Sequence, residues 1–161
     1  MAESSVEGFV PLSPTEAYDV FVNQIDVWWP RQGIFPYSFA PKTTRPLHIR
    51  FEPYEKGRLY ETFLDNTEYV IGHIIQYQPP HKLVHTWRDP TWDGDTTVTV
   101  TFREMDGGTQ FIMEQDGFAA VGQPDMPPYY AIGNRQTMAA FVAHCVATDE
   151  LRQLQQESSG D

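Results

Sequence analysis

Residues 96–118 read TTVTVTFREMDGGTQFIMEQDGF, and this stretch decides the fold class. Apolar residues and threonines alternate along its first part, which is typical of a half-buried β-strand. The Asp106-Gly107-Gly108 segment predicts a tight turn, after which residues 109–115 pair back. The expected apolar face consists of Val98, Val100 and Phe102 on one strand, and of Phe111, Met113 and Gln115 on the next.

Further strands precede this hairpin. Residues 48–52 and 58–64 flank a turn at 55–57, and residues 69–78 and 82–88 follow after short connections. Short connections make the sheet antiparallel. By the same alternation, one face should carry Leu59, Glu61 and Phe63, and Leu83, His85 and Trp87. The Ile74-Ile75 pair breaks the alternation and predicts a β-bulge.

Two short helices are expected after a first strand at residues 6–12. Ser13 and Glu16 form a capping pair around Pro14, which predicts a helix over residues 14–23. A helix of one or two turns follows and is stopped by Pro30. Residues 31–46, rich in Pro, Phe and Tyr, predict an ordered loop over an opening.

A closing helix is expected after a proline-rich connection at residues 117–133. It should start at Asn134, because Met138, Phe141, Val142 and Cys145 form an apolar stripe. Thr148-Asp149-Glu150 resembles a new cap, which predicts a break near Thr148, and residues 153–161 predict a polar, frayed tail.

The fold class is therefore α+β, with a curved antiparallel sheet of about six to seven strands wrapped around the C-terminal helix. Residues 1–161 are expected to form a single domain, with its core over about residues 6–147. Such an arrangement leaves space between sheet and helix, where ligand sites are common.

Composition limits the partners. The formal net charge of −11 disfavours nucleic acid and anionic membranes. The lone Cys145 cannot form an intrachain disulfide, so a cytoplasmic location is expected. No signal peptide and no apolar run of membrane-spanning length is evident.

The chain resembles the activator-of-heat-shock-chaperone-ATPase-like branch of the START-like (SRPBCC) superfamily, over roughly residues 6–147. The matching segments are Ser13-Pro14-Thr15-Glu16-Ala17, Val20-Phe21, Trp28-Trp29-Pro30, Gly57-Arg58, Gly72, Pro79-Pro80-His81-Lys82-Leu83-Val84, Thr86-Trp87, Gly107-Gly108-Thr109 and Gly117-Phe118. The resemblance implies a helix-grip fold with a pocket. It leaves activity open, since similar proteins include carriers, polyketide aromatase/cyclases, co-chaperones and antibiotic-resistance proteins. The separate N-terminal domain of full-length co-chaperones is not expected here.

Ligand-binding residues follow from the inward faces and the aromatic segments. They are Trp28, Trp29, Phe35, Leu59, Glu61, His85, Trp87, Val100, Phe111, Met113, Gln115, Phe118, Met138 and Phe141. Glu61, His85 and Gln115 would orient a polar ligand end or act as acid and base, or else pair with protein groups. Adjacent tryptophans either stack on a ligand or anchor a helix. Trp92 in a turn-rich loop suggests an exposed lid or partner contact. Residues of the two long loops suit an entrance or a cover over the core: Phe35, Tyr37, Phe39, Met126, Tyr129 and Tyr130.

The sequence contains no motif for metal binding, nucleophilic catalysis or phosphate binding. The histidines show no metal-ligand spacing, and no nucleophile elbow or phosphate loop is present, so no metal, cofactor or catalytic residue is expected. Cys145 lies on the apolar stripe, which is typical of an inert core thiol. Asp89, Asp93 and Asp95 lack the spacing of a calcium loop.

The favoured hypothesis is non-catalytic binding of a small apolar or aromatic ligand by a carrier, sensor or resistance protein. The alternatives are a cyclase or aromatase using His85 or Glu61, and a protein-interaction module that stimulates a chaperone ATPase. A protein partner and the oligomeric state stay open.

Overall fold

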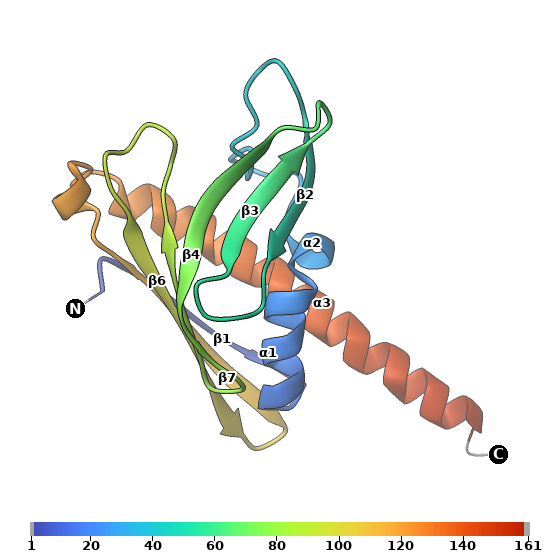
Figure 1. Cartoon of the computed structure of the whole chain (residues 1–161). Helices are drawn as coiled ribbons and strands as arrows, with labels where there is room; N and C mark the ends of the chain where they lie inside the picture. Colours follow the sequence, from blue (N-terminus) through green and yellow to red (C-terminus); the bar gives the residue numbers. More distant parts are fainter. Residues whose placement is uncertain (1, 160–161) are drawn as a thin grey trace.

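A curved sheet lies against one long helix in the computed structural model, which describes residues 2–159 (Figure 1). The seven strands are antiparallel in the order β1-β7-β6-β5-β4-β3-β2. They are β1 (Ser4–Val10), β2 (Pro46–Phe51), β3 (Arg58–Phe63), β4 (Glu68–Gln78), β5 (Lys82–Trp87), β6 (Thr96–Met105) and β7 (Gly108–Asp116). The helices are α1 (Pro14–Asn23), α2 (Ile25–Trp28), the 3-10 turn η1 (Ala119–Val121) and α3 (Pro127–Ser159). The predicted α+β helix-grip architecture is confirmed.

The β6–β7 hairpin has the predicted faces. Val100 pairs with Met113 and Phe102 with Phe111, and all four side chains are buried. The pairing of Met105 with Gly108 leaves a two-residue turn, in which Gly107 adopts a left-handed φ of 83°. Alternation thus determines the buried face of this hairpin, and the two-residue turn sets its register.

The sheet bends at β4. Its pairing with β5 shifts register between Ile74 and Gln76, which confirms the predicted bulge. At Gly72, a Cβ atom would lie 1.9 Å from the carbonyl oxygen of Thr86, so the backbones approach as only glycine allows. Both features help the sheet to curl toward α3.

The predicted cap of α1 is present. The Ser13 hydroxyl accepts a hydrogen bond from the Glu16 amide at 3.3 Å, and Pro14 occupies the first helical position. The predicted helix over residues 14–23 is thus confirmed.

The predictions for the closing helix were wrong in three respects. It begins at Pro127 instead of Asn134, it runs without a break through Thr148, and it stays helical to Ser159, so residues 153–159 are not frayed. The Thr148 hydroxyl donates to the His144 carbonyl at 2.9 Å, which is a bond inside the helix and not a new cap. Residues 160 and 161 lie outside the described residues.

The length of α3 divides it into regions with different neighbours. Phe141 and Cys145 are fully buried, whereas Leu151 and Leu154 are 60% and 59% exposed. Figure 1 shows the C-terminal part of this helix projecting past the sheet. No helix among residues 2–159 is both long enough and apolar enough to span a membrane.

An aromatic cluster fills the space under the middle of α3. Phe21 meets Trp28, Phe102 and Phe141 with ring centroids 5.2, 5.8 and 5.2 Å apart, and Phe111 meets Phe141 at 5.4 Å. Cys145 lies beside this cluster, and burial raises the pKa of its thiol to about 12, which suits an inert core residue.

Candidate ligand-binding cavity

A cavity of about 390 Å³ lies between the concave face of the sheet and the first turns of α3. Its volume falls in the range of about 300–1,000 Å³ that is usual for small-molecule sites. Phe21 and Trp28 of the aromatic cluster form part of its wall, and α3 contributes Asn134 and Thr137 among others.

Ten of the predicted ligand-contact residues line the cavity. They are Trp28, Trp29, Phe35, Leu59, Glu61, His85, Trp87, Met113, Gln115 and Met138. The other four lie elsewhere: Val100, Phe111 and Phe141 belong to the packed core, and Phe118 packs against Trp92 and Tyr130.

The cavity wall is strongly aromatic. Ten of its 27 residues are Phe, Tyr or Trp, and Trp28, Trp29 and Trp87 are three of the four tryptophans in the chain. The Trp87 ring lies 6.1 Å from Trp29 and 5.6 Å from Phe39, measured between centroids. These rings offer flat apolar faces of the kind that bind planar aromatic molecules.

The wall contains no Lys or Arg. Its carboxylate side chains are Glu61 and Asp89. Among residues 2–159, no group of three His, Cys, Asp or Glu residues is placed to hold a metal ion. The charged side chains of the wall are therefore acidic, and most of the remaining side chains are apolar.

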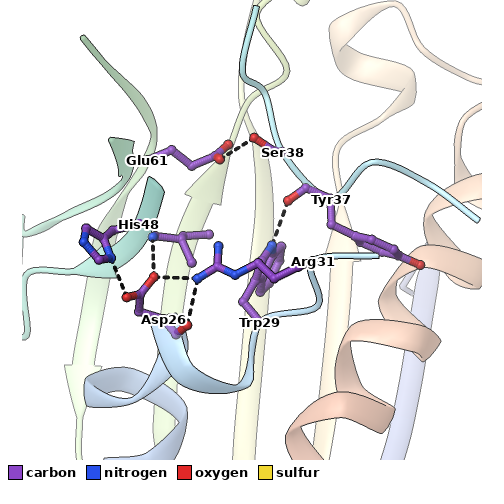
Figure 2. Close-up of polar contacts among 8 residues, drawn as sticks. Asp26, Trp29, Arg31, Tyr37, Ser38, His48 and Glu61 are labelled. Carbon is purple, nitrogen blue, oxygen red and sulfur yellow. Dashed lines mark hydrogen bonds and ion pairs between the residues drawn. The ribbon is translucent and has the colours of Figure 1, made fainter. Parts of the chain in front are cut away.

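Glu61 holds the loop that covers the cavity. From β3, its carboxylate accepts a hydrogen bond from the Ser38 hydroxyl at 2.6 Å (Figure 2) and one from the Phe39 amide at 2.7 Å. Burial raises the pKa of Glu61, while these two bonds act in the opposite direction. Both oxygens are engaged, so Glu61 is a tether for the loop.

A second tether holds the beginning of the same loop. Asp26 on α2 contacts Arg31 and His48, each at 2.7 Å, and accepts from the Ile49 amide at 3.0 Å (Figure 2). Partial burial disfavours the charged form of Asp26, but these hydrogen bonds together outweigh it and lower the pKa of the carboxyl group. The cluster joins α2 to β2 and to the start of the loop.

The third tether ends at a strained residue. The Trp29 indole donates to the Tyr37 carbonyl at 2.8 Å, and Tyr37 has a left-handed φ of 52°. A Cβ atom at residue 33 would lie 2.6 Å from the Tyr37 ring, so Gly33 makes room for it. The Tyr37 hydroxyl is buried without a hydrogen-bond partner, and burial raises its pKa, so it keeps its proton.

His85 on β5 is an enclosed ionisable group in the wall, with 3% of its surface exposed, as for Glu61. Its Nδ1 lies 2.8 Å from the Thr86 carbonyl oxygen, which only accepts, so Nδ1 carries the hydrogen. Burial lowers the pKa of the imidazole to about 4, so the ring is neutral at pH 7. Its Nε2 is then a hydrogen-bond acceptor, and it has no hydrogen-bond partner among residues 2–159.

Gln115 belongs to a chain of hydrogen bonds that ties α3 to the sheet. Its carbonyl accepts from Asn134 at 2.9 Å, its amide donates to the Thr96 hydroxyl at 2.9 Å, and Thr96 donates to the Trp87 carbonyl at 2.8 Å. The predicted inward orientation of Gln115 is confirmed, and the side chain is paired at both ends.

Trp92 is 7% exposed and packs against Phe118 and Tyr130, so the expectation of an exposed lid or partner contact was wrong. The physical reason is that Phe118 and Tyr130, both remote in sequence, pack on its ring.

The sequence interpretation missed Asn134 and Thr137 as lining residues and placed Tyr130 in a loop. Steps of four residues back from Met138 reach Asn134 and then Tyr130, which is the spacing of one helical face. The misplaced start of the helix hid this signal.

The curved antiparallel sheet, closed by a long C-terminal helix over an apolar cavity, defines a START-like protein of the helix-grip type. More narrowly, the chain belongs to the family described as Activator of Hsp90 ATPase homolog 1-like protein, whose model matches residues 12–145. The predicted superfamily and branch are thereby confirmed.

Solved structures of similar fold include a protein from Rhodobacter sphaeroides, with 20% identity, a TM-score of 0.65, and coverage of 93% of this chain and 94% of that one. Protein MLL2253 from Mesorhizobium loti has 19% identity and a TM-score of 0.63, covering 86% and 93%. An anthrahydroquino-γ-pyrone synthase, Txn09, complexed with SUM, has 25% identity and a TM-score of 0.56, covering 89% and 99%. A search of curated proteins found no match. The family fold supports a ligand-binding or polyketide-cyclase-like role in general.

Proposed function

We propose that the protein binds a small apolar or aromatic molecule in this cavity without converting it, as a carrier, sensor or sequestering protein. The observation that carries the proposal is a cavity of about 390 Å³ inside a wall rich in Trp, Phe and Tyr. Protein interiors are normally close-packed, so a cavity of this size next to a packed core is suited to binding a small molecule.

The remaining polar features fit this role. Glu61 and Gln115 are engaged in hydrogen bonds that position the loop and α3, which leaves them unsuited to proton transfer. The buried single thiol of Cys145 suits a reducing compartment such as the cytoplasm. The net charge of −11 argues against nucleic acid as the partner.

The direct test is a thermal-shift screen with aromatic metabolites, polyketides and fatty acids. A ligand at about 100 times its dissociation constant stabilises the folded state by about 2.7 kcal/mol. The blocking variant is Gly133→Leu, because Gly133 lies in the wall on α3 and leucine would project toward Phe35 and the cavity. Ala143→Leu, an exposed position on the same helix, is the matched control.

We expect hits with the wild type and with Ala143→Leu, and none with Gly133→Leu. A well-folded wild type without any hit, or hits that persist in Gly133→Leu, would overturn the proposal.

An enzymatic role of the cyclase or aromatase type is the second candidate, and the 25% identity to Txn09 favours it. This role requires that the protein converts a poly-β-keto substrate, as detected by mass spectrometry, and that the conversion is lost in His85→Ala. Product formation at catalytic protein concentrations would replace the binding proposal.

A third candidate is stimulation of a chaperone ATPase, which the description of the family favours. This role needs no cavity. An ATPase assay in which Gly133→Leu stimulates as well as the wild type would support it and count against ligand binding as the function.

A further inference from the structure

The polar groups of the cavity wall differ in whether they are already paired. Most are engaged with protein partners: Glu61 with Ser38 and Phe39, Gln115 with Asn134 and Thr96, Trp29 with Tyr37, and Trp87 with Tyr130. By contrast, Nε2 of His85 and the Tyr37 hydroxyl have no hydrogen-bond partner among residues 2–159. The Tyr37 hydroxyl is buried, and a buried polar group without a partner is costly; Nε2 belongs to a residue of the cavity wall and keeps its lone pair. These two atoms therefore indicate where a ligand completes the site.

A backbone contact determines which ring nitrogen of His85 donates a hydrogen bond and which one accepts. Nδ1 faces the Thr86 carbonyl at 2.8 Å and must donate, so the neutral ring presents only a lone pair at Nε2. A ligand group that satisfies this atom must carry a hydrogen. Ketones, ethers and ester oxygens cannot do so.

The charge of the wall narrows the choice further. With no Lys or Arg in it, and with Glu61 and Asp89 present, a carboxylate or phosphate would be buried without a counter-charge. The hydrogen must therefore come from a neutral group. A hydroxyl fits best, because its oxygen also accepts, and the protonated Tyr37 hydroxyl offers a donor to a ligand oxygen.

We infer that the ligand is an uncharged hydroxylated aromatic compound, a phenol or an enol, whose O–H donates to Nε2 of His85. This inference rests on the proposed function and adds the chemical class of the ligand. His85 is then the specificity-determining residue of the cavity, and the Trp29, Phe39 and Trp87 rings bind the aromatic body.

The test compares four probes that share one ring system. Dissociation constants of the full chain for 2-naphthol, naphthalene, 2-methoxynaphthalene and 2-naphthoate are measured at pH 7 by titration calorimetry or equilibrium dialysis. We expect 2-naphthol to bind about fivefold tighter than naphthalene and 2-methoxynaphthalene, the effect of one net hydrogen bond. The carboxylate should bind most weakly.

The decisive variant is His85→Phe, in which the ratio of the naphthalene and 2-naphthol dissociation constants should fall to about one. The ratio is taken within each variant, so a general change in cavity size cancels. His73→Phe, the same substitution at an exposed position on β4, should keep the wild-type ratio. If His85→Phe fails to fold, the ¹⁵N shift of Nε2 in the wild type replaces it, and 2-naphthol but not 2-methoxynaphthalene should move that signal.

The inference is overturned if the wild type binds 2-naphthol and 2-methoxynaphthalene equally, if the preference survives in His85→Phe, if 2-naphthoate binds best, or if Nε2 does not respond. These results differ from failure of the proposed function, in which the folded wild type binds none of the four probes.

Discussion

Glu61 and Ser38 are joined by a hydrogen bond of 2.6 Å that crosses from the sheet to the loop over the cavity. The neighbouring Phe39 amide uses the other oxygen of the same carboxylate. One buried side chain thus determines the position of the segment that covers the site.

Replacing Glu61 by Gln should loosen the loop without unfolding the protein. Glutamine has one acceptor oxygen for the two donors, so one of the two hydrogen bonds is lost. In compensation, the substitution removes the cost of burying a charged group, which is the burial that raises the pKa of Glu61. We expect the free energy of unfolding to change by less than about 1 kcal/mol, and the hydrogen exchange of the Phe39 amide to accelerate about tenfold. Glu55→Gln, at an exposed turn, should change neither; an unaltered Phe39 exchange rate in Glu61→Gln would contradict the tether.

His85 should make the protein less stable in mild acid. Burial lowers its pKa from 6.5 to about 4, so between these values the unfolded chain takes up a proton that the folded protein refuses. Stability is therefore lost as the pH falls through this window, by up to about 3 kcal/mol. In denaturant titrations, the free energy of unfolding of the wild type should fall between pH 7.5 and pH 4 by this amount more than that of His85→Phe. The control His73→Phe should behave as the wild type does. Parallel curves for the wild type and His85→Phe would contradict a buried neutral imidazole.

Gly133→Ala should stabilise the protein. The added Cβ would lie 3.6 Å from the Phe35 ring, which is an ordinary van der Waals contact, and alanine is the better helix former. We expect a gain of about 1 kcal/mol in the free energy of unfolding, measured by urea titration. A loss of stability would show that the Phe35 side of the cavity cannot adjust by even one methyl group.

Removal of residues 150–161 should have little effect on folding or on ligand binding. Leu151 and Leu154 are largely exposed, and the truncation breaks the surface ion pair between Arg152 and Glu16. Exposed pairs of this kind contribute up to about 1 kcal/mol. A truncated chain that melts within a few degrees of the wild type would agree with this, and cooperative loss of the fold would show that the projecting end is structurally required.

The sheet and its inward faces could be predicted because alternation is a local signal. Val98, Val100 and Phe102 needed only a period of two, and the Ile74-Ile75 pair marked the bulge by breaking that period. His85 was placed on the inner face in the same way. Its tautomer was not predictable, because the Thr86 carbonyl was not known to face Nδ1.

The errors concern features that depend on remote partners or on ambiguous residues. The Thr148 hydroxyl can form a hydrogen bond either inside a helix or as an N-cap. The sequence does not distinguish these two, and in the structure it bonds to the His144 carbonyl inside α3. Trp92 is buried by Phe118, and the left-handed conformation of Tyr37 depends on contacts with Trp29 and Gly33. No local pattern reports such contacts.

The division of α3 into a cavity-lining start, a core-packed middle and a projecting end has a consequence for detecting ligands. Amide protons around Asn134 and Thr137 lie in turns whose opening a ligand would oppose, while those after Leu151 belong to turns that no ligand reaches. A single continuous helix thus contains both a reporter of occupancy and its own internal reference, so the ratio of the two exchange rates would report ligand binding with the pH dependence of intrinsic amide exchange common to both.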